Sequence, residues 1–215
     1  MSAEPADGRA DQLVDRVVDK VVELLRRPWV EVEASGRHVH VCRATADRLF
    51  GVGAALEPVA DLSQPGQFVS RQRIQLIGPK GQFSAVVILG PERSKTQVEI
   101  SATDALTLGI EAPVRLSGDL AGTPGVVLVG PAGRVELDGG VIIARRHIHM
   151  RPDFARRHGL ADRQAVSVRV WGERGLTFDQ VIVRVSPDFA TFMHIDYDEA
   201  NACGFRPRMT GCVLV

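Results

Sequence analysis

Hydrophobic positions divide the chain into a helical N-terminal segment and a strand-rich body. From Asp11 to Arg27, valine and leucine recur at the i, i+3, i+4, i+7 spacing, which predicts an amphipathic helix that Pro28 ends. Residues 1–10 are small and polar, and we expect them to be loose. The apolar stripe of the helix needs a surface to cover it. That surface belongs to its own domain, to another subunit or to a separate partner, and the sequence does not decide among the three.

After Pro28, short valine-rich runs alternate with Gly/Pro turns, which predicts many short strands. The clearest strands are expected at residues 30–34, 73–77, 83–89, 126–129, 141–144, 166–170 and 181–185. Short helices fit at residues 44–50, 103–108, 152–158 and 197–203. This spacing predicts a mainly β fold of small β-barrels with short capping helices and the N-terminal amphipathic helix.

Composition and charge exclude several classes of protein. The 215 residues, 45 % of them hydrophobic, suffice for one large domain or two small ones. Lys plus Arg (26) equals Asp plus Glu (26), so no net charge favours nucleic acid or an anionic membrane as a partner. No apolar run approaches the roughly 18 residues of a membrane span, and no signal-peptide pattern is visible, so we expect a cytoplasmic location. Three cysteines without a Cys-x-x-Cys pair indicate neither a disulfide framework nor a thiolate metal site.

Two motif pairs reveal an internal duplication. Residues 37–41 (Arg-His-Val-His-Val) recur as residues 146–150 (Arg-His-Ile-His-Met), and each copy precedes a short helical stretch that ends in glycine. Residues 99–105 align with residues 194–200, and both segments contain the pattern of a helix capping box. The offsets of the two pairs differ, so the sequence predicts two related halves whose segments interleave along the chain.

The matched positions carry metal-binding chemistry. Because residues i and i+2 of a strand share a face, each His-x-His motif presents two imidazoles together. The second motif pair adds a carboxylate in one half and an imidazole in the other. Two sets of three such donors suit two divalent ions, each with an open position, and zinc fits best. The six candidate ligands are His38, His40, Glu99, His147, His149 and His194. Which three serve which ion is left open.

Two arginines are candidates for binding an anion. Arg93 follows a Gly-Pro-Glu turn just before the segment of Glu99, so it can lie near the metals if the loop folds back. A planar guanidinium suits a bidentate phosphate contact. Arg115 and Ser117 share a face of another predicted strand. The alternative for each arginine is a surface ion pair. No phosphate-binding glycine loop or serine nucleophile elbow is present in the sequence.

The motifs together closely resemble one enzyme family, the PduL-type phosphotransacylases (phosphate propanoyltransferases), from about Val30 to the C-terminus. The motifs, in order, are Arg-His-Val-His (37–40), Gln-Pro-Gly-Gln-Phe (64–68), Gly-Pro-Lys-Gly (78–81), Thr-Gln-Val-Glu-Ile-Ser (96–101), Arg-His-Ile-His-Met (146–150) and Met-His-Ile-Asp (193–196). The resemblance implies interconversion of a short-chain acyl-CoA (propanoyl-CoA or acetyl-CoA) plus phosphate with acyl phosphate plus CoA. It also implies two β-barrels around a dinuclear zinc centre with the same six ligands.

The resemblance implies a domain division and further site residues. An N-terminal tail and helix (1–27) would precede one barrel built from residues 28–36 plus 145–215. A second barrel would comprise residues 37–144, with a small inserted sheet near 51–71. Arg93 would hold phosphate with Ser117 close by. The residues bordering the CoA site would be Ser35, Leu89 and Asn201.

Partners and location follow from the same resemblance. The expected ligands are CoA, short-chain acyl-CoA and inorganic phosphate, and a homo-oligomer is expected. Many relatives carry an N-terminal helix that targets them into bacterial microcompartments, where it would meet shell or enzyme partners, while others work free in the cytoplasm. Two other functions stay open: a dinuclear metal-dependent hydrolase of thioesters or phosphoesters, and a non-catalytic binding module with structural metals.

Overall fold

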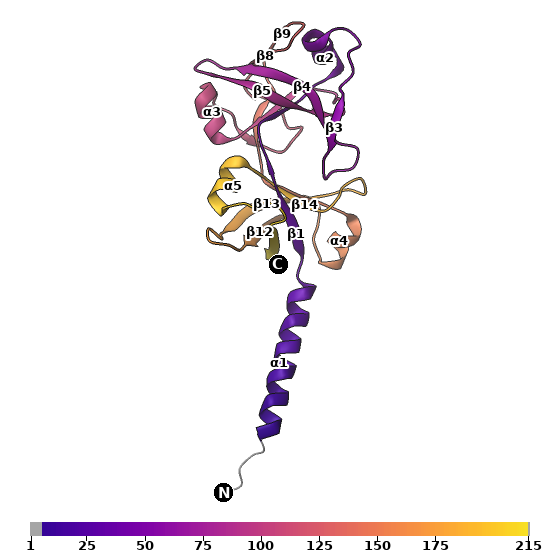
Figure 1. Ribbon diagram of the computed structural model, residues 1–215, viewed down its shortest axis with the longest axis vertical. Helices are drawn as coiled ribbons and strands as arrows, with labels where there is room; N and C mark the ends of the chain where they lie inside the picture. Colours follow the sequence, from indigo (N-terminus) through magenta and orange to yellow (C-terminus); the bar gives the residue numbers. More distant parts are fainter. Residues whose placement is uncertain (1–5, 215) are drawn as a thin grey trace.

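The computed structural model describes residues 6–214, as a long helix followed by two stacked β bodies (Figure 1). Helix α1 (Ala6–Arg26) begins earlier than its apolar stripe, so the expectation that residues 1–10 are loose was wrong for residues 6–10. Hydrophobic periodicity gives no signal there, because residues 6–10 are small or polar and carry no apolar stripe. The stripe itself stays in solvent, with Leu25 76 % exposed, and the helix points away from both bodies (Figure 1).

The first body is a closed six-stranded barrel. Its strand order around the barrel is β1 (Trp29–Ser35), β14 (Phe192–Asp196), β11 (His147–Met150), β13 (Thr177–Val185), β12 (Ala165–Val170) and β15 (Thr210–Leu214). Alternating valines, isoleucines and methionines fill its interior, among them Ile148, Met150 and Met193, all fully buried.

The second body is a nine-stranded half-barrel. Its order is β7 (Val114–Arg115), β10 (Val141–Ala144), β6 (Gln97–Ile100), β2 (His38–His40), β5 (Gln82–Gly90), β4 (Phe68–Ile77), β8 (Val126–Val129) and β9 (Arg134–Leu137), with β3 (Pro58–Asp61) paired to β4. Within the described chain, its end strands β7 and β9 do not close the sheet. The predicted mainly β fold with two barrel-like bodies is confirmed, and only the first is fully closed.

Strand pairing confirms the internal repeat. The run β10-β6-β2-β5-β4-β8 repeats the run β1-β14-β11-β13-β12-β15. In both runs the first and third pairs are parallel and the second, fourth and fifth are antiparallel. The sequence motifs therefore mark a duplicated three-dimensional unit.

The chain crosses between the two bodies twice, next to the two His-x-His motifs. Strand β1 of the barrel leads through residues 36–37 into β2 of the half-barrel, and β10 leads through residues 145–146 back into β11 of the barrel. Each histidine pair thus begins where the chain passes from one body to the other, and the two pairs meet at the junction.

Four short helices follow the motif strands close to their predicted places. They are α2 (Arg43–Phe50), α3 (Ala102–Leu108), α4 (Pro152–Arg157) and α5 (Tyr197–Cys203). Both predicted capping boxes are present, with Ser101 and Asp196 as the caps of α3 and α5. No helix among residues 6–214 is long and apolar enough to cross a membrane.

Candidate active site

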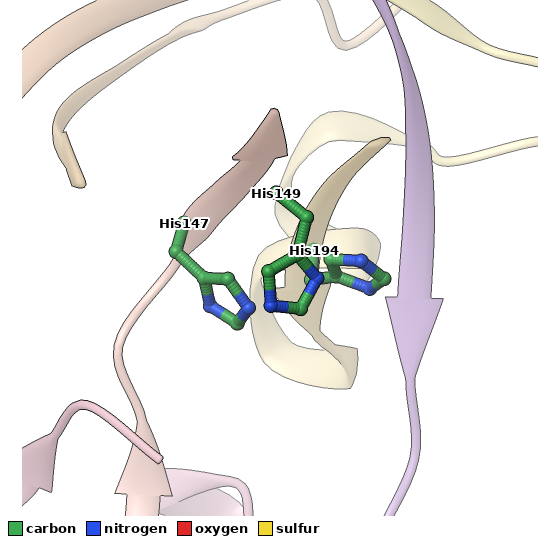
Figure 2. Close-up of side chains that lie close together, drawn as sticks. All are labelled: His147, His149 and His194. Atoms are coloured by element: carbon green, nitrogen blue, oxygen red, sulfur yellow. The ribbon is translucent and has the colours of Figure 1, made fainter. Parts of the chain in front are cut away.

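The six predicted ligands gather in two groups of three, one from each β body. In each group the potential ligand atoms all lie within 4.8 Å of one another. His38, His40 and Glu99 form the first group, and His147, His149 and His194 form the second. Figure 2 shows the second group, with the three rings turned toward one another. The division that the sequence left open therefore follows the two halves of the repeat.

Strand register explains why the groups match. His38 lies directly opposite Glu99 in the antiparallel pair of β2 and β6, and His147 lies opposite His194 in the pair of β11 and β14. Directly opposed residues share a face and bring their Cβ atoms to about 5 Å. The remaining histidine of each motif, two residues on, joins the same face.

Backbone carbonyls orient several of the rings. The Nδ1 atom of His38 lies 2.8 Å from the carbonyl oxygen of Gly36, and Nδ1 of His147 lies 2.9 Å from that of Arg145. A neutral ring that donates through Nδ1 keeps a lone pair on Nε2. Such second contacts hold a metal-binding histidine in the required tautomer. For the first histidine of each motif, the repeat therefore reproduces the carbonyl contact as well as the residue.

Burial keeps most of the imidazoles neutral. Burial and the positive neighbours lower the pKa of His40 to about 3, and burial with His147 nearby lowers that of His194 to about 3. Burial also acts to lower the pKa of His38, but the Glu99 carboxylate outweighs it and raises that pKa. Burial would raise the pKa of Glu99, yet the neighbouring His38, His40 and Arg93 lower it well below its usual range. A carboxylate and neutral imidazoles are the protonation states that metal ligands require.

The donor set fits divalent transition-metal ions. Five imidazoles and one carboxylate are typical zinc ligands. Nδ1 of His149 is buried and has no hydrogen-bond partner in the described part of the chain. A buried polar atom without a partner is costly, and a bound ion in this group would provide the missing interaction.

An arginine fixes each motif to the helix beside it. Arg37 pairs with Asp104 at 2.6 Å, and Arg146 pairs with Glu199 at 2.7 Å. Each acid also closes the capping box of its helix. The strand with the histidines and the helix after the third ligand are thereby held together in both halves.

The loop that carries Arg93 folds back onto the first ligand group. The backbone N–H of Arg93 donates to the carbonyl of Val41, the residue after His40, at 2.9 Å. The guanidinium of Arg93 donates to Ser117 Oγ at 3.0 Å. The buried amide of Gln97 donates to the same hydroxyl at 2.8 Å and to the Glu99 carboxylate. Arg93 and Ser117 therefore belong to one network with a predicted ligand.

A cavity of about 930 Å³ lies between the two bodies and is lined by residues of both. Its wall includes all six candidate ligands together with Arg93 and Ser117. Ser35 and Leu89 also line it, whereas Asn201 is exposed on α5 and is not part of the wall formed by the described residues. The roles of these three residues at a CoA site stay predictions.

Three further residues at the second group were not singled out from the sequence. Gln64 exchanges hydrogen bonds of 3.2 Å with the backbone of Ala190, and its Nε2 lies 3.4 Å from Nε2 of His194. A carboxylate oxygen of Glu33 lies 3.6 Å from the other ring nitrogen of His194. Arg184 lies 3.5 Å from His149. Gln64 falls within a quoted family motif, whereas the repeat counterpart of Arg184 is Leu89, so no shared residue type marked it in the sequence.

A cavity with two such donor groups and a guanidinium beside it is typical of enzymes that act on phosphate groups or activated carbonyls with the help of metals. Comparison with known proteins narrows this class. Residues 31–206 match the family described as Phosphate propanoyltransferase. The chain therefore belongs to the phosphate propanoyltransferase family, a family of acyltransferases, and the resemblance seen in the motifs is confirmed.

Several relatives carry this name and match over most of their length. The chain is 57 % identical over 185 residues to the Phosphate propanoyltransferase of Listeria monocytogenes, covering 86 % of this chain and 87 % of the relative. It is 58 % identical over 184 residues to that of Enterococcus faecalis, with the same coverage. Against that of Thermotoga maritima, identity is 51 % over 182 residues, with 84 % and 87 % covered.

Proposed function

We propose that this protein is a phosphate acyltransferase that interconverts a short-chain acyl-CoA, such as propanoyl-CoA or acetyl-CoA, plus phosphate with acyl phosphate plus CoA. The observation that carries the proposal is the cavity in which both donor groups meet the Arg93–Ser117 pair. Its volume suits a small organic ligand rather than phosphate alone. The names of the relatives support the same reaction.

Two divalent ions, preferably zinc, would be held by the two ligand groups. His38, His40 and Glu99 would hold one ion, and His147, His149 and His194 the other. When bound, the ions would neutralise phosphate charge and polarise the thioester carbonyl.

The protein's own residues would bind and orient the substrates. Arg93 would hold phosphate through two N–H groups, with Ser117 fixing the plane of its guanidinium. One phosphate oxygen would attack the thioester carbonyl carbon, so that a C–O bond forms as the C–S bond breaks. CoA would leave as the thiolate and take a proton from solvent, without a covalent acyl-enzyme. Holding the reactants in place would supply much of the rate enhancement.

The remaining expectations extend this proposal. Ser35, Leu89 and Asn201 would border the bound CoA. The strand membership of the two bodies supports a barrel unit of residues 28–36 plus 145–215 and a second unit of residues 37–144. The exposed stripe of α1 supports docking to microcompartment shell or enzyme partners. The alternative location is the cytoplasm outside a microcompartment. In either location we expect a homo-oligomer.

Free-thiol release from propanoyl-CoA tests the reaction. Purified protein is assayed with and without inorganic phosphate, before and after treatment with a chelator. Release that needs both phosphate and metal is the expected result. Metal-dependent release without phosphate would instead identify water as the acceptor and a hydrolase, and no release under any condition would indicate a binding module.

A further inference from the structure

Arg184 is a second arginine at the ligand groups, and it comes from the other β body than Arg93. It lies on β13 directly opposite His149 of β11 in the parallel pair. One guanidinium nitrogen lies 3.5 Å from Nε2 of His149, and the guanidinium carbon lies 5.7 Å from the ring centroid of Phe189. The side chain lines the same cavity as Arg93 and both ligand groups.

The charge of this guanidinium is not balanced locally. Arg184 and Arg93 are both partly buried, and neither forms an ion pair with a carboxylate of the described residues. Glu99 and Asp162 attract Arg184 only at longer range. A partly buried cation without a counterion is costly. An anion bound in the cavity would remove this cost.

The repeat shows that the frame does not itself require a cation here. His38 pairs with Val87 on β5, and His147 pairs with Ile182 on β13, so the residues two positions on, Leu89 and Arg184, occupy matched places. One half of the duplicated unit therefore presents a leucine where the other presents a guanidinium. The arginine is a property of one side of the cavity, which points to a ligand rather than to the fold.

We propose that Arg184 is a second phosphate-binding residue, which contacts the oxygens of the transferred phosphate from the barrel while Arg93 contacts them from the half-barrel. This inference rests on the proposed function. The phosphate groups of CoA offer the same chemistry, but the position of Arg184 beside His149 favours the phosphate that reacts. The matched Leu89 gives the opposite wall an apolar surface for the acyl-CoA.

The test replaces Arg184 with its own repeat counterpart. Arg184→Leu removes the charge, Arg184→Lys keeps the charge but loses the planar fork, and Arg134→Leu removes an exposed arginine of β9 outside the cavity. Metal-loaded proteins are titrated with inorganic phosphate by calorimetry, and their bound metal is counted. The KM values for phosphate, propanoyl-CoA and propanoyl-CoA lacking the 3′-phosphate are then measured.

Arg184→Leu is expected to weaken phosphate binding and raise the phosphate KM by roughly 10- to 100-fold. Metal content and the KM for propanoyl-CoA should stay unchanged. Arg184→Lys should show a smaller loss, and it carries the test if the leucine variant does not fold. Arg134→Leu should match the wild type.

Three results would overturn the inference. Unchanged phosphate binding in Arg184→Leu would remove Arg184 from the site. A rise in KM for propanoyl-CoA alone, absent with the substrate that lacks the 3′-phosphate, would assign Arg184 to CoA. Loss of metal would make it a positioning residue for His149. Calorimetry needs no turnover, so failure of the proposed reaction in the wild type is distinguishable from failure of this inference.

Discussion

The two ligand groups occupy the same places in two copies of one strand arrangement, yet their charges differ. In the half-barrel, the third position is Glu99, a carboxylate that accepts a hydrogen bond from Gln97. In the barrel, the third position is His194, and Arg184 stands beside the group. Each side has an arginine and a carboxylate, but in the barrel the carboxylate is Glu33, 3.6 Å from His194 and outside the donor group, whereas in the half-barrel it is a member of the group.

This difference shows how a duplicated unit acquires distinct roles. The backbone pairing is retained in both halves, and so is the carbonyl contact of the first histidine in each motif, His38 and His147. Side chains at single positions then set the charge on each side. The repeat thus accounts for the shared geometry, and differences at single positions account for the asymmetry that the proposed reaction of an anion with a thioester would need.

The largest expected effect is loss of a ligand from either group. His38→Ala and His147→Ala change the same repeat position, so each should lose one ion per chain and lower turnover by roughly 1000-fold or more. Metal analysis and thiol release measure both. His158→Ala, at the end of α4 and outside both groups, is the control. Full metal occupancy in His147→Ala would contradict the six-ligand arrangement.

Replacing Arg93 should have the next largest effect. Arg93→Ala removes the proposed phosphate contact on the half-barrel side, so the phosphate KM should rise and turnover fall, with kcat/KM reduced by about 100-fold. Lys95→Ala removes an exposed cation close by in the chain and should leave the kinetics unchanged. Near-normal kinetics in Arg93→Ala would show that Arg93 does not bind phosphate and that the half-barrel does not contact the anion through this residue.

The matched capping boxes allow a smaller, structural comparison. Asp104→Ala and Glu199→Ala each remove the N3 carboxylate of a capping box and an arginine partner, so each should lower the free energy of unfolding by about 1–3 kcal/mol. The effect should be greater for Asp104, whose side chain is 7 % exposed against 19 % for Glu199. Urea unfolding measures it, with the exposed Glu136→Ala as control. A larger loss of unfolding free energy for Glu199→Ala than for Asp104→Ala would show that side-chain burial does not decide the contribution of these two ion pairs.

The smallest effect is expected from removing α1. Its apolar stripe is exposed and the helix points away from both bodies, so deletion of residues 1–26 should change kcat/KM by no more than about twofold. The assay is thiol release, together with thermal unfolding of both proteins. A large loss of activity would mean that the helix stabilises the catalytic bodies through a contact with another subunit.

Local structure could be predicted well from the sequence. Helix α5 falls at its predicted residues, and both capping boxes form as the pattern indicated. The short strand β9 was not predicted, because a strand of four residues depends on its pairing partner more than on its own composition. The early start of α1 was also missed, since no apolar periodicity marks its first turns.

The sequence predicted only part of the candidate site, because only the repeated residues carried a pattern. Repetition singled out six residues as ligands, and the structure brings all six to one cavity. Arg184 carried no comparable pattern, because an arginine near the end of a strand is usually a surface residue. Only the parallel pairing of β11 with β13 places it next to His149.

The sequence by itself determined most of the strands, the caps and the chemistry of the repeated positions, because these depend on neighbours a few residues apart. Tertiary structure alone decided which ligands form a group, which body closes and which arginines meet in the cavity. Those outcomes depend on strands far apart in the chain, such as β2 with β6 and β11 with β14, which pair only within a folded body.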